Sequence, residues 1–119
     1  MASYNWTPVV MSLLNHLQKA GVTITAVDNG EDLIEIDNSV SNLKQRKAAC
    51  EEIVSVDESY VRLGYGPEQK RAHLFIVLGN EPCETVCDYG TADDSGIVDN
   101  AIDNFIAAWE GRKCPMVND

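Results

Sequence analysis

The sequence has no hydrophobic run long enough to cross a membrane, which requires about 20 consecutive apolar residues. Its most apolar stretch, residues 72–79, contains an uninterrupted apolar run of only five residues, Leu74 to Leu78. The first residues also lack the basic start and apolar core that mark a secretory signal. We therefore expect a cytoplasmic protein that does not bind membranes.

Cysteine is too scarce for a disulfide scaffold, with four in 119 residues, and reduced thiols are expected. Cys83 and Cys87 are separated by three residues, whereas structural zinc ligands usually lie closer together and occur as two pairs. On a strand their sulfurs would lie about 13 Å apart, too far to share an ion or a disulfide. Only a loop joined by His73 and Cys114 would rescue a metal site, so we expect no metal and no cofactor.

Motifs for catalysis are missing as well. The chain has no nucleophile elbow, phosphate loop, dinucleotide fingerprint or paired zinc-ligand motif. His16 and His73 are the only histidines, and the sequence does not show whether either lies near a cysteine, as a Cys–His catalytic pair requires. Gly64-x-Gly66 lies between two predicted strands, where a turn is expected. We predict a protein without catalytic activity.

Positive charge is the other scarce feature, because 19 acidic residues against nine basic ones give a net charge of −10. This charge opposes nonspecific binding to nucleic acid or to anionic membranes. Residues 21–43 and 81–110 contain no Lys or Arg at all. The second segment supplies a predicted acidic binding patch of Glu84, Asp88, Asp93, Asp94, Asp99 and Asp103.

The spacing of two of these acids suggests one specific role. Asp99 and Asp103 are four residues apart on a predicted helix, hence neighbours about 6 Å apart on one exposed face. That distance resembles the spacing of phosphates on a nucleic-acid strand. Acidic faces also keep proteins soluble, and acids near a helix N-terminus stabilise the helix dipole, so the patch has an ordinary explanation too.

Hydrophobic periodicity, caps and turn residues divide the chain into helices and strands. Thr7 with Pro8 predicts a helix start, Gly21 its end, and Asn29-Gly30 a hairpin. Helices are predicted over 8–20, 40–55 and 97–110, the last capped by Asp94 or Ser95, and strands over 22–27, 33–37, 60–65, 72–79 and 84–89. Residues 1–6 read as a lead-in and 112–119 as a tail of one domain, 1–119.

The order α-β-β-α-β-β-(β)-α predicts an α+β fold, with an antiparallel sheet of four or five strands and three helices on one face. The run 72–79 is expected to be the central strand. Phe75 and Val77 should lie on the opposite face from Ile76, and if uncovered they would form an interface. The predicted core is Val10, Leu13, Leu14, Leu17, Ile24, Ile34, Ile36, Leu43, Ile53, Val61, Leu63, Leu74, Ile76, Leu78, Val98, Ile102, Phe105 and Trp109.

These observations predict a small acidic cytoplasmic module for protein interaction or regulation, without catalytic activity. Its expected partner is a protein, basic in charge or a second copy of the chain in a homodimer, and neither nucleic acid nor a membrane. Lys44, Arg46 and Lys47, on the predicted solvent side of the second helix, would neutralise acids or complete a self-association surface. Two alternatives stay open: a nucleic-acid mimic that blocks the basic site of a DNA-binding protein, and a small-molecule-binding domain or Cys-dependent enzyme.

Overall fold

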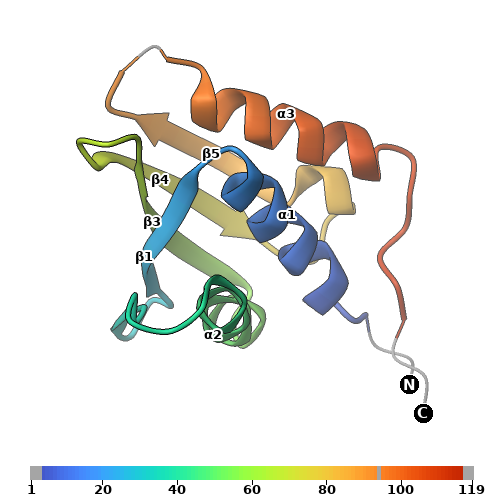
Figure 1. The fold of residues 1–119 in the computed structure, drawn as a ribbon. Helices are drawn as coiled ribbons and strands as arrows, with labels where there is room; N and C mark the ends of the chain where they lie inside the picture. Colours follow the sequence, from blue (N-terminus) through green and yellow to red (C-terminus); the bar gives the residue numbers. More distant parts are fainter. Residues whose placement is uncertain (1–3, 94, 117–119) are drawn as a thin grey trace.

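A computed structural model describes residues 4–93 and 95–116 and confirms the α+β prediction, with five strands and three α-helices in the expected order (Figure 1). A short 3₁₀ helix precedes the last strand. The elements are α1 (Thr7–Lys19), β1 (Val22–Asp28), β2 (Leu33–Glu35), α2 (Asn42–Val54), β3 (Glu58–Tyr65), β4 (Lys70–Val77), η1 (Pro82–Glu84), β5 (Val86–Thr91) and α3 (Ile97–Trp109).

The five strands form one antiparallel sheet in the order β2-β1-β3-β4-β5. The middle strand is therefore β3, and the prediction that residues 72–79 form the central strand is wrong by one position. The error arose because the hydrophobicity of a strand indicates how deeply it is buried, not its position in the order of the sheet. Leu74 and Ile76 are buried on β4, while Phe75 and Val77 on its other face are only partly covered.

The helices pack on one face of this sheet, with α1 lying between α2 and α3 (Figure 1). Gly21 ends α1 with φ of 81°, a left-handed conformation that favours glycine. Ser41 caps α2 by accepting a hydrogen bond from the Lys44 amide at 3.3 Å. The Ncap of α1 is Trp6, one residue before the predicted Thr7.

The start of α3 also differs from the predicted cap. Gly96 is the Ncap, in the left-handed region with φ of 77°. Ser95 contributes from one residue earlier, where its hydroxyl accepts a hydrogen bond from the Ile97 amide at 3.4 Å. Asp94, the other predicted cap, lies outside the described residues.

Most of the predicted core is buried between the helices and the sheet. Leu43 is the clear error: it lies in the first turn of α2 and is 48% exposed, because the buried side of that helix begins only at Ala49. Ile34 and Leu78 are half-buried. Tyr65, which was not predicted as core, is fully buried.

The two ends of the described chain lie together. The amide of Asn5 donates to the Pro115 carbonyl at 2.7 Å, and Tyr4 forms an isolated antiparallel bridge with Met116. Trp6 packs against the core and Cys114 is buried. The described parts of the predicted lead-in and tail thus close one end of the domain. Within the described part of the chain, no helix is both long and apolar enough to cross a membrane.

Two neighbouring residues of β4 test the division of the sheet into a covered and an open face. Ile76→Asp places a charge in the fully buried core and should lower the free energy of unfolding by more than about 4 kcal/mol, which unfolds most small domains. Val77→Asp should cost about 1 kcal/mol, because its side chain is partly in solvent. Urea denaturation followed by circular dichroism measures both, and equal losses would contradict the assignment.

Candidate functional site

The sheet face turned away from the helices carries an uninterrupted row of side chains across all five strands. The strand registers align Leu33 of β2 with Asp28 of β1, Tyr60 of β3, Phe75 of β4 and Asp88 of β5. Alternation along each strand directs these side chains away from the core. Because all three α-helices lie on the other side, we call this surface the open face.

Two aromatic rings lie at the centre of the row. Tyr60 and Phe75 stack with ring centroids 4.6 Å apart and planes 19° from parallel. Tyr60 is 51% exposed, and Phe75 is partly covered. An aromatic pair in an open sheet stabilises its two strands, but it also leaves a rigid apolar surface in water. Such surfaces are enriched at binding interfaces.

A second row of the open face is hollowed because two of its residues lack a long side chain. This row runs through Glu35, Ala26, Arg62, His73 and Gly90. The hollow has a volume of about 880 Å³. Its side-chain walls come mainly from the three strands β1, β3 and β4, so no helix contributes to it.

Two polar side chains lie close over glycines of the open face. A Cβ atom added to Gly90 would lie 2.4 Å from Cε1 of His73, so the imidazole rests directly on the backbone of β5. Gly64 is covered in the same way by Gln69, whose Oε1 would lie 2.7 Å from an added Cβ. The two glycines thus let polar side chains lie flat over the sheet.

The open face carries charges of both signs, and the acid Glu35 lines the hollow together with two arginines. Arg62 and Arg71 are exposed at the hollow, and neither forms an ion pair with any residue that the structure describes. Glu58 and Asp88 are exposed at the other end, beside the aromatic stack. Two unpaired guanidinium groups on a chain with net charge −10 are suited to an acidic partner surface.

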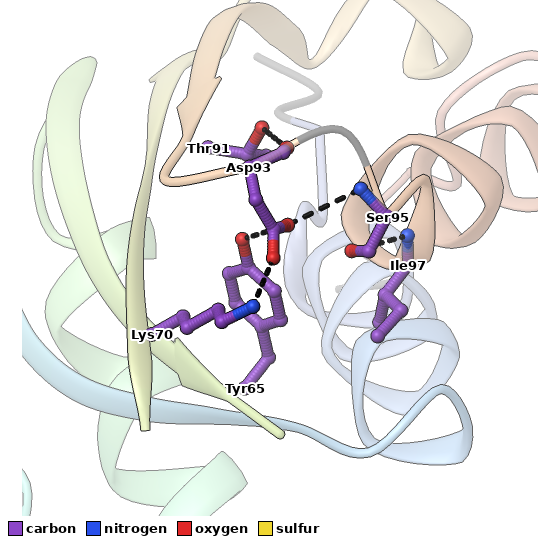
Figure 2. A network of polar contacts seen from close by, with 6 residues as sticks. All are labelled: Tyr65, Lys70, Thr91, Asp93, Ser95 and Ile97. Carbon is purple, nitrogen blue, oxygen red and sulfur yellow. Dashed lines mark hydrogen bonds and ion pairs between the residues drawn. The ribbon is translucent and has the colours of Figure 1, made fainter. Parts of the chain in front are cut away.

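A network of polar contacts centred on Asp93 lies at the edge of the domain, next to the open face. The Asp93 carboxylate lies between the Tyr65 hydroxyl, which donates at 2.7 Å, and the ammonium group of Lys70 (Figure 2). The Ser95 amide donates to the same carboxylate at 3.2 Å. Asp93 therefore ties the β5–α3 connection to the β3–β4 hairpin.

The network shifts the titration of all three ionisable side chains. The hydrogen bonds from Lys70 and Tyr65 hold the pKa of Asp93 well below its usual range. Burial, followed by the hydrogen bond to Asp93, raises the pKa of Tyr65. The hydrogen bond and charge of Asp93 raise the pKa of Lys70. Asp93 is thus held by partners within the chain.

The five acids of the predicted patch that the structure describes lie on different elements and on both sides of β5. Asp88 lies on the open face, whereas its neighbour Tyr89 points to the other side, where a hydrogen bond with Asp99 raises the pKa of the phenol. Asp99 is half-buried rather than exposed, and Asp103 is exposed. Glu84 lies in η1, Asp93 is paired with Lys70, and Asp94 lies outside the described residues.

The four cysteines are free thiols. Cys83 lies in η1 and Cys87 is exposed on β5. Burial, with a smaller effect of Glu51, raises the pKa of Cys50 to about 11, and burial also raises the pKa of Cys114. Thiols with raised pKa values are poor nucleophiles at neutral pH. Within 4–93 and 95–116, no group of three His, Cys, Asp or Glu side chains could hold a metal ion.

Sequence reasoning singled out Phe75 and Val77 on this face but missed Tyr60, Arg62 and His73 as part of the same surface. The available signal was the period of two: residues 60 and 62 on one strand and 71, 73 and 75 on the next all alternate with apolar residues. Their alignment depends on the register between strands, which the period does not give.

Comparison with known proteins adds no relative, since no family model, curated protein or solved structure matches the chain.

The Asp93 network predicts a specific dependence of stability on pH. A carboxyl whose pKa is lower in the folded than in the unfolded state stabilises the fold above about pH 4, and this contribution is lost as the pH falls further. The raised pKa values of Tyr65 and Lys70 act in the opposite sense. Each group stabilises the fold below about pH 10, and this contribution to stability is lost as the pH rises further.

Asp93→Asn should therefore lower the urea midpoint at pH 7 and flatten its decline between pH 5 and pH 2. Asp103→Asn is the matched control, because Asp103 is exposed and has no hydrogen bond to a neighbouring side chain within the described residues. Denaturation curves at several pH values give the comparison. Identical acid profiles for wild type and Asp93→Asn would show that the network does not contribute to stability.

Proposed function

We propose that the protein is a protein-interaction module whose open face binds a second copy of the same chain. The observation that carries this proposal is the exposed Tyr60–Phe75 stack at the centre of a sheet face that no helix covers. Burying a large aromatic side chain contributes about 1.5–3 kcal/mol. A partner that covers the stack would therefore gain free energy at the position where interface energy is usually concentrated.

The arrangement of charges favours a second copy over an unrelated partner. Arg62 and Arg71 outnumber the acid Glu35 at one end of the open face, and Glu58 and Asp88 lie toward the other. In a dimer with a two-fold axis, each surface meets its own inverted copy. If the axis passes near the stack, the basic end of one chain faces the acidic end of the other at two equivalent contacts.

The other hypotheses have less support from the geometry. A nucleic-acid mimic needs an unbroken acidic surface, whereas the predicted acids are distributed over both sides of β5 and one is neutralised by Lys70. A Cys-dependent enzyme needs a nucleophilic thiol, and two of the four are buried with raised pKa values. Interaction through the open face uses exposed side chains, among them Tyr60 and two arginines without an ion-pair partner among the described residues.

A charge-swap experiment tests the dimer. In a dimer of the Arg62→Glu/Arg71→Glu variant, the new acids of one chain face the acidic end of the other chain. In a dimer of the Glu58→Arg/Asp88→Arg variant, basic side chains face basic side chains in the same way. Each double variant alone should dimerise at least about tenfold more weakly than wild type, a change of about 1.4 kcal/mol. Mixed together, they should form a heterodimer, because both contacts become attractive again. Sedimentation equilibrium at low and high salt measures these affinities.

The control is Asp103→Arg/Glu110→Arg, which reverses two exposed charges on the helical side and should leave dimerisation unchanged. Circular dichroism checks that every variant is folded. A wild-type chain that stays monomeric at millimolar concentration would contradict the proposal. Double variants that fail to form a heterodimer would contradict the two-fold arrangement.

A further inference from the structure

Basic residues gather on the helical side of this acidic protein, opposite the open face. Residues 1–27 and 38–50 together contain no Asp or Glu, although the chain has 19. They contain Lys19, Lys44, Arg46 and Lys47, four of its nine basic residues. Because α1 packs against α2, and Arg46 lines a hollow together with α1 residues, the two segments form one region rich in basic side chains.

A hollow of about 520 Å³ lies in this region, beside α1 and the first half of α2. None of its lining residues is acidic. Its polar lining consists of Ser12, Asn15, His16, Gln18, Lys19 and Arg46. Three of these six side chains are able to carry positive charge, which is the reverse of the chain's overall balance.

Arg46 is the unexpected member of this set. It was predicted to lie on the solvent side of α2, but it is half-buried, and its Nε and Nη1 atoms are buried with no hydrogen-bond partner among the described residues. A guanidinium group stays charged under all ordinary conditions. Buried N–H groups are nearly always paired, because an unpaired one loses its hydration without compensation. An oxyanion in the hollow, which Arg46 lines, would balance the charge of this half-buried guanidinium group.

His16 lines the same hollow. Its Nδ1 lies 2.7 Å from the carbonyl oxygen of Ser12, and since a carbonyl only accepts, Nδ1 must carry the proton. The edge contact with Phe105, at 6.2 Å between ring centroids, holds the ring in place. Nε2 is therefore the ring nitrogen that this hydrogen bond leaves free, and in this tautomer it is an acceptor.

We propose that this hollow binds an oxyanion, the phosphate or carboxylate group of a small ligand. Arg46 is the main contact, Lys19 adds charge and hydrogen bonds, and His16 donates from Nε2 only when its imidazole is doubly protonated. Arginine suits this role because its guanidinium carries several donors in a fixed plane. The site is separate from the proposed dimer surface, so either proposal can fail without the other.

Inorganic phosphate and acetate are the probes, titrated into ¹⁵N-labelled protein with sodium chloride holding the ionic strength constant. The expected result is saturable shifts of α1 and α2 amide signals with at least one probe. Saturation by phosphate alone assigns the site to phosphorylated ligands, and saturation by acetate alone assigns it to carboxylates. Arg46→Gln should weaken this binding at least tenfold, and Lys19→Gln by a smaller factor.

Lys47→Gln is the matched control, since it removes the same charge from the next residue, which is exposed and does not line the hollow. It should change the affinity less than twofold. Arg46→Met should abolish binding without lowering the urea midpoint of the ligand-free protein, because it removes an unpaired buried charge and keeps the apolar stem. No saturable shifts with either probe in the wild-type protein would overturn the proposal, as would equal affinities for Arg46→Gln and wild type.

Discussion

The structure depends on burial of the sheet on one side only. Three helices of 13 residues each cover one face of five strands, and the core lies between these two layers. Apolar burial is the main favourable contribution to the stability of such a domain. The other face then has to be compatible with water, and it is so through Thr, Arg and His side chains laid around a small aromatic centre.

This one-sided arrangement makes the edges of the domain important. At one end the segments around Asn5 and Pro115 pair with each other and complete the core with Trp6 and Cys114. At another edge of the domain, Asp93 links the connection between the last strand and the last helix to the β3–β4 hairpin. A buried phenol such as Tyr65 needs a hydrogen-bond partner, and Asp93 supplies it while its charge is balanced by Lys70.

The distribution of charge is the second organising feature. Although the net charge is −10, the protein has two basic regions. One lies on the open face around Arg62 and Arg71, and the other lies along α1 and α2 around Arg46. These regions lie on opposite sides of the sheet and suit different ligands. The open face is broad and partly apolar, as protein interfaces are, whereas the hollow beside Arg46 is polar and of the size of a small molecule.

The sequence by itself determined the element order, the fold class and most of the core, because periodicity, caps and turns are local properties. Ser41, Gly21 and Asn29-Gly30 each acted where local chemistry predicts. It also determined that Phe75 and Val77 lie opposite Ile76. Only the tertiary structure decided that β3 is central, that Leu43 is exposed, and that the described acids of the predicted patch lie on both sides of β5. The pairing of Tyr60 with Phe75 and the burial of Arg46 depend on strand register and helix packing, which join residues distant in the chain and leave no local pattern.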